Sequence, residues 1–161
     1  MKTSHFLSIT TALSLLALGA AGAQTATQTV TFQVDAVNQI AVTGAPSLTI
    51  NTATAGSGLT SATSSGNTWA VTTNQTGAKI TASIASAMPA GLTLSANLGA
   101  PSGATSAGLK ALGVTAVDMV TGITKLSASG LSLSYQLDAN ASAGVVASGT
   151  RVVTYTITGG A

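Results

Sequence analysis

The sequence contains no cysteine, a single histidine and few charged side chains, and these shortages exclude several kinds of protein. Charged residues make up 5% and aromatic residues 3% of the 161 residues. Without cysteine there is no disulfide framework, so apolar packing alone has to hold the fold together. The sequence has five cationic side chains and three carboxylates, and the cationic residues are scattered singly along the chain. Nucleic-acid binding needs clustered Lys and Arg to neutralise phosphates, so the sequence predicts no nucleic-acid partner.

The first 23 residues have the pattern of a cleavable signal peptide. A positive residue precedes the apolar run Phe6–Leu18, which is shorter than the about 20 residues that span a bilayer. Small residues follow, and Ala21-x-Ala23 fits the small-x-small cleavage pattern. We expect cleavage to leave Gln24–Ala161 as one domain that is secreted, held at the cell surface or kept in a periplasm. No second apolar run follows, so we expect no integral membrane segment after cleavage; the alternative is an uncleaved N-terminal anchor.

The mature chain has too few reactive groups to build a common catalytic site. The only histidine of the sequence, His5, lies in the signal peptide, so the mature chain has no histidine, and it has no cysteine or glutamate either. The carboxylates Asp35, Asp118 and Asp138 are expected to face solvent or cap turns. Asp138 and Asn140 would supply two oxygen ligands, whereas calcium takes about 6–8. Because acid–base and nucleophilic catalysis need a base, an acid or a metal beside the substrate, we predict no enzyme, no cofactor and no metal site.

Alternation of apolar and polar residues dominates after the signal peptide, and this period of two predicts β-strands. The expected strands lie at 29–36, 40–42, 47–50, 68–73, 79–85, 92–98, 112–123, 131–137 and 150–158. Turn residues at Asn74–Gly77 predict a hairpin between the two strands that they join. A change of phase within 112–123 predicts a β-bulge or a strand that changes sheets. No helical period occurs, so the predicted fold class is all-β: an antiparallel Ig-like (Greek-key) β-sandwich of about eight or nine strands.

Two features are candidates for contact with another molecule. In the first expected strand, Val30, Phe32 and Val34 share one face, and such a strand can insert into the sheet of a neighbouring subunit. The alternative is that it is the first strand of its own sandwich. Trp69 begins a strand after a long loop and is the candidate for ligand contact, because sugar rings stack on exposed aromatic faces. Its phase with aliphatic neighbours fits burial in the core equally well.

Three stretches carry a resemblance to a broad group of proteins. TVTFQVDAVNQIAV after the signal, WAVTTNQTGAKITASI in the middle and RVVTYTITGG at the end resemble small secreted bacterial surface proteins with an Ig-like or fimbrial-type β-sandwich. The resemblance implies a structural role at the cell surface, as a pilus or coat subunit, although the disulfide pair of chaperone-assembled fimbrial subunits is missing. The sequence therefore predicts a non-catalytic secreted or cell-surface structural protein that assembles with itself or with other envelope proteins. The alternative is an extracellular binding or adhesion module for glycans.

Overall fold

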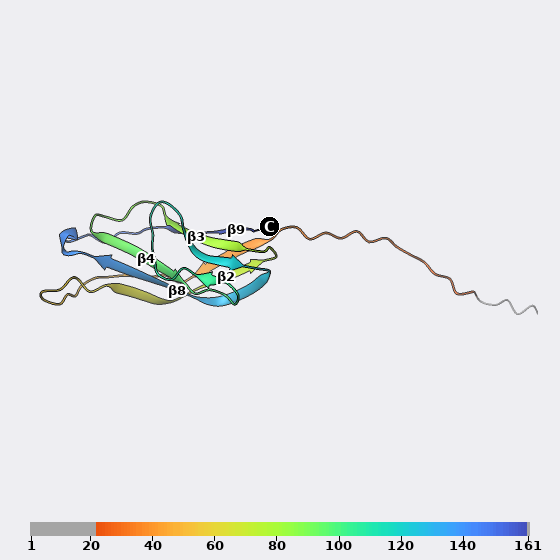
Figure 1. Ribbon diagram of the computed structural model, residues 1–161, viewed down its shortest axis with the longest axis horizontal. Helices are drawn as coiled ribbons and strands as arrows, with labels where there is room; N and C mark the ends of the chain where they lie inside the picture. Colours follow the sequence, from red (N-terminus) through yellow and green to blue (C-terminus); the bar gives the residue numbers. More distant parts are fainter. Residues whose placement is uncertain (1–21, 161) are drawn as a thin grey trace, which may run out of the picture. The chain divides into compact units, whose positions relative to one another are not determined.

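The computed structural model describes residues 22–160, and these form two antiparallel β-sheets without an α-helix. The first sheet has the strand order β1-β2-β8-β4-β6, and the second has the order β5-β7-β3-β9. The strands are β1 (Asn38–Thr43), β2 (Ala62–Thr73), β3 (Ala78–Ile84), β4 (Leu92–Leu98), β5 (Thr105–Ser106), β6 (Lys110–Ala111), β7 (Val117–Ile123), β8 (Leu126–Ala139) and β9 (Val153–Thr158). Figure 1 shows β2, β4 and β8 in one layer and β3 and β9 in the other. The all-β prediction is confirmed.

The sheets belong to one compact unit that starts at Val34, and the residues before Val34 form a separate unit. Most of the predicted signal peptide, residues 1–21, lies outside the described residues. A short 3-10 turn, Ala141–Ala143, follows β8. In the described part of the chain, no helix is long and apolar enough to cross a membrane.

The core lies between the two sheets and is built by the alternation seen in the sequence. In β3, Ala78, Ile80, Ala82 and Ile84 are at most 2% exposed, while the residues between them are only partly covered. The largest fully buried side chains come from both sheets, and they are Trp69, Ile80, Leu98, Met119, Ile123, Val71 and Val120. Burying each large apolar side chain contributes about 1.5–3 kcal/mol, so this inner layer holds the cysteine-free sandwich together.

The change of phase predicted in 112–123 is present in β7. Met119 and Val120 are consecutive residues, yet both are completely buried. The pairing of β7 with β3 shifts register on both sides of Ile80, which lies opposite Val120. An irregularity of this kind turns two neighbouring side chains to the same side of a sheet.

The predicted hairpin at Asn74–Gly77 is wrong. β2 pairs with β1 and β8 in the first sheet, whereas β3 pairs with β7 and β9 in the second. The turn therefore connects the two layers of the sandwich. Turn residues specify a reversal of the chain, and a strand with both edges already paired cannot accept the next strand as its neighbour.

Three further expectations about strands are corrected by the structure. Residues 29–36 form no strand, because the first sheet begins only at Asn38. Residues 47–50 also lie outside the regular strands. The long loop expected over residues 51–67 ends earlier, because β2 starts at Ala62 and its polar first half pairs with β8. Hydrogen bonding to β8 thus extends a strand that has little apolar patterning of its own.

Candidate functional site

The segment 29–36 carries three large apolar side chains that are exposed. Val30 is 72% exposed, Phe32 is 91% exposed and Val34 is 83% exposed. All three lie on the same side of an extended chain, because they alternate with polar residues. The structure keeps together the three residues proposed for strand exchange, and it leaves them accessible.

The end of this segment is held by the side chain of Asn74, at the turn that leaves β2. The backbone N–H of Val37 donates to Asn74 Oδ1 at 2.8 Å, and Asn74 Nδ2 donates to the carbonyl of Asp35 at 2.7 Å. Neighbouring side chains extend the network, since Asn38 Nδ2 donates to Gln75 Oε1 at 3.0 Å. One amide side chain thus takes the place of a strand partner and directs residues 35–37 straight into β1.

At its other end, β1 stops at a glycine that the local geometry requires. Gly44 has a φ of +126°, which L side chains rarely adopt, and a Cβ placed there would collide with the side chain of Asn67. After Gly44 the chain leaves the ladder with β2. It then runs through residues 46–50 as one wall of an open groove.

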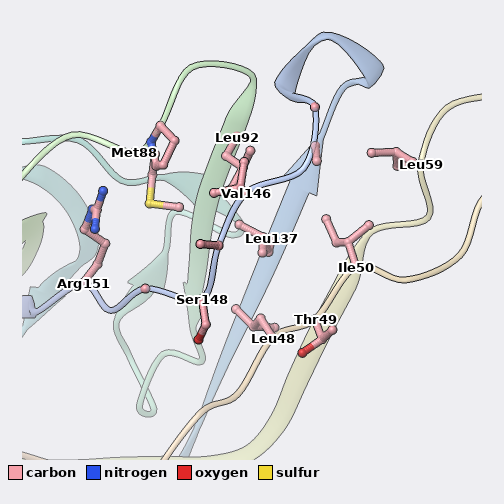
Figure 2. A pocket seen from close by; sticks show the side chains of 15 residues that line it. Leu48, Thr49, Ile50, Leu59, Met88, Leu92, Leu137, Val146, Ser148 and Arg151 are labelled. Atoms are coloured by element: carbon pink, nitrogen blue, oxygen red, sulfur yellow. The ribbon is translucent and has the colours of Figure 1, made fainter.

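We name this feature the β1–β9 groove. One wall is formed by residues 42–50 and the other by residues 146–155. Leu94 of β4 and Tyr135 and Leu137 of β8 lie at its floor. It consists of two adjoining cavities of about 530 Å³ and 340 Å³. Figure 2 shows Leu137 between the two walls at the smaller cavity, with Ile50 on one side and Val146 on the other.

A pair of tyrosines joins the two sheets at the larger cavity. The hydroxyl of Tyr155 in β9 donates to the hydroxyl of Tyr135 in β8, with 2.9 Å between the oxygens. Burial raises the pKa of Tyr155 far above its ordinary value, and the hydrogen bond to Tyr135 raises the pKa further. Tyr155 therefore stays neutral and remains a donor at any physiological pH. Both tyrosines line the larger cavity of the groove.

Trp69 is not placed where a ligand would reach it. It is 1% exposed, and its Nε1 donates to the carbonyl of Gly99 at 3.1 Å. The ring is part of the core between the sheets. Sugar stacking on its face would require the core to open.

The three carboxylates are dispersed, and two of them, Asp118 and Asp138, are engaged in structural contacts. Asp118 pairs with Lys79 on the surface of the second sheet, with 2.9 Å between the atoms. Asp138 accepts hydrogen bonds from Ser61 and from Gln136. Asn140 accepts a hydrogen bond from Ser142 at 2.7 Å. Among residues 22–160, no group of three or more His, Cys, Asp or Glu side chains comes together.

The groove residues were missed in the sequence, although a signal for them was present. Val146, which lines the smaller cavity, lies in a segment for which the sequence predicts no strand, and it is 41% exposed. Leu48 belongs to a segment taken for a short strand. Apolar residues in segments that form no regular strand are therefore the feature of the sequence that indicates such a groove.

Comparison of the chain with protein-family models, with curated proteins and with solved structures finds no match. The arrangement of the site therefore has to carry the functional argument. It comprises an exposed alternating segment and a groove in a sandwich, and no three His, Cys, Asp or Glu side chains gather among the described residues.

Proposed function

We propose that the chain is exported by its first 23 residues and serves outside the cytoplasm as a non-catalytic structural subunit. Copies of the subunit assemble through the segment 29–36, on a scaffold of the Ig-like Greek-key kind. The observation that carries this proposal is the exposure of Val30, Phe32 and Val34 in a segment with strand-like alternation. The crossing of chain segments between the two sheets supports the Greek-key arrangement, because β2 is followed along the chain by a strand of the opposite sheet.

Exposure of this kind favours assembly over a role in the monomer. A single exposed apolar side chain is common on protein surfaces and needs no explanation. Three on one face of an extended segment are different, because together they form the inward face of a half-buried strand. Strand addition buries such a face and also satisfies the backbone groups of the segment. A net charge of only +2 over 161 residues offers little repulsion between copies.

The glycan-binding alternative has less support. Its candidate contact, Trp69, is buried in the core, so the chain's one tryptophan is not an exposed stacking platform. The smaller cavity of the β1–β9 groove is lined largely by aliphatic side chains such as Leu48 and Val146, whereas polar residues, among them Ser47, Thr150 and Arg151, also line the larger cavity. Sugar sites need a denser set of hydrogen-bonding groups, because every hydroxyl that loses water needs a partner.

The test compares Gln24–Ala161 with two double variants. Each variant introduces two negative charges, the first variant on the apolar face of the segment and the second on its polar face. Val30→Asp with Phe32→Asp places two carboxylates on the apolar face. Thr29→Asp with Thr31→Asp places them on the polar face and is the matched control. Light scattering and negative-stain microscopy measure assembly, and circular dichroism verifies the fold of each protein.

We expect the unchanged protein and the polar-face variant to form oligomers or filaments, and the apolar-face variant to stay monomeric while remaining folded. Equal assembly of all three proteins would contradict a role for the apolar face. A stable monomer of the unchanged protein at high concentration would remove self-assembly altogether, and a glycan screen would then be the next experiment.

A further inference from the structure

We propose that the β1–β9 groove of one copy receives residues 29–36 of a second copy as an added strand. This inference rests on the self-assembly proposed above and names the surface that receives the segment. It joins two separate features of the chain, an alternating segment without a sheet and a sandwich with an open apolar groove.

The dimensions and chemistry of the two features agree. Successive side chains on one face of a strand are about 6.6 Å apart, so Val30, Phe32 and Val34 span roughly 13 Å. The two cavities along residues 42–50 share Leu48 and Thr49 in their lining, so they adjoin each other and can take side chains that follow one another on one face of a strand. Both cavities lie within the about 300–1,000 Å³ that is typical of binding pockets. The groove can therefore bury the apolar face of one strand.

The walls of the groove also offer backbone groups that a strand can use. β1 pairs only with β2, and β9 pairs only with β3, so each has a free edge within residues 22–160. Residues 45–50 take part in no backbone–backbone hydrogen bond of the described chain. In residues 145–152, the carbonyl of Val152 accepts one from the N–H of Ala85, and the carbonyl of Thr150 accepts one from the guanidinium of Arg151. An inserted strand would pair with these groups in place of water.

Charge does not oppose the insertion. Arg151 is the only charged residue that lines either cavity, and its guanidinium donates to the carbonyls of Ala87 and Thr150. Residues 29–34, which carry the three apolar side chains, have no charge, and Asp35 is the only charged residue of the segment 29–36. The part of the segment that carries Val30, Phe32 and Val34 therefore loses no charged group to water when it enters the groove.

The geometry at Asn74 favours a second copy over the chain's own segment. Asn74 holds the backbone of Asp35 and of Val37 as a straight continuation of β1. The groove is lined from Val42 onward, toward the opposite end of β1. Insertion into the same molecule would need the chain to break both hydrogen bonds and reverse direction within residues 35–37. A second copy can deliver its segment with these bonds intact.

Disulfide trapping tests this proposal directly, because the chain has no cysteine of its own. Val30→Cys, Phe32→Cys and Val34→Cys are each made in one protein and mixed with a second protein that carries Ser148→Cys. Ser148 is exposed and lines both cavities. Thr154→Cys is the matched control, because Thr154 is exposed on the face of β9 opposite Tyr155. A disulfide needs Cα atoms about 4.4–6.8 Å apart, so only direct neighbours are trapped.

We expect at least one segment cysteine to give a disulfide-linked dimer with Ser148→Cys, and Thr154→Cys to give less than a tenth of that yield. Continued assembly without such a dimer, or with equal yields from both partners, would overturn the groove as the receiving surface while leaving self-assembly in place. Absence of assembly in the unchanged protein would remove both proposals.

The last variant of the disulfide-trapping experiment carries Phe32→Cys and Ser148→Cys in the same chain. Its oxidation at low concentration to a disulfide-closed monomer would show that the segment occupies its own groove, and that result would overturn insertion into a second copy. Linked dimers and larger species from the same chain would support it.

Discussion

Replacement of Phe32 by alanine separates the stability of the subunit from the strength of its assembly. Phe32 is 91% exposed, so the folded monomer loses almost no buried contact in the Phe32→Ala variant. Surface substitutions of this kind usually change the free energy of unfolding by less than about 0.5 kcal/mol. Ile80→Ala is the reference for a core position, because Ile80 is 0% exposed. We expect it to lower the free energy of unfolding by about 2–5 kcal/mol.

Assembly should respond in the opposite order. Burial of a phenylalanine side chain in the groove of another copy contributes about 1.5–3 kcal/mol. Because about 1.4 kcal/mol corresponds to a factor of ten, Phe32→Ala should weaken association roughly 10- to 150-fold. Urea unfolding below the concentration at which assembly begins, followed by the fluorescence of Trp69, measures the stability. Light scattering over a concentration series measures the association.

The result that refutes this reasoning is a large loss of monomer stability. A decrease of 2 kcal/mol or more on Phe32→Ala, on the order found for core truncations, would place the phenylalanine in its own sandwich. The segment would then be the first strand of that sandwich.

Two further predictions concern the core and the tyrosine pair. Trp69 is the only tryptophan and is buried, so the fluorescence of the protein should be blue-shifted, poorly quenched by acrylamide and unchanged by sugars. Trp69→Phe removes the hydrogen bond to the carbonyl of Gly99 and should lower the free energy of unfolding, measured by denaturant titration, by about 1–3 kcal/mol. Burial raises the pKa of Tyr155, so the folded state keeps a proton that the unfolded chain releases above about pH 10. Stability should be intact below that pH and fall above it by at most about 1.4 kcal/mol per pH unit, and Tyr155→Phe should make that decline shallower in urea titrations at pH 9–11.

The alternation in the sequence predicted which faces of the strands are buried, but not which strands are neighbours. The inward residues of β3 and β4 follow the pattern closely, and Ile80, Ile84 and Leu98 are buried as the period of two requires. The same pattern could not separate a hairpin from a crossing between sheets at Asn74–Gly77. That choice depends on β8, which lies more than fifty residues further along and occupies the edge of β2. Pairing between strands so far apart in the sequence produces no pattern in the residues near the turn.

Residues 29–36 show a second limit of the pattern. Their alternation is that of a strand that will be half-buried, and it is as regular as that of β9. Periodicity reports the environment for which a segment is suited, but it does not say which molecule supplies that environment. The groove was hidden for a related reason, because Leu48, Leu59 and Val146 come from segments far apart in the sequence and only the fold places them around Leu137.

The free edges of the sandwich support the same conclusion as the exposed segment, namely that copies of the chain assemble by adding a strand. Soluble β-proteins protect their edge strands with charged residues, proline or bulges, because an open edge pairs with other chains. Neither β1, with the sequence NQIAVT, nor β9, with VTYTIT, contains a charged residue or a proline. Both edges adjoin the groove, where Arg151 is the only charged lining residue, and other charges lie away from it, as at Lys79 and Asp118 on the second sheet. An edge left unprotected beside an apolar groove is a liability in a monomer, whereas in a subunit that receives a strand there it is the binding surface.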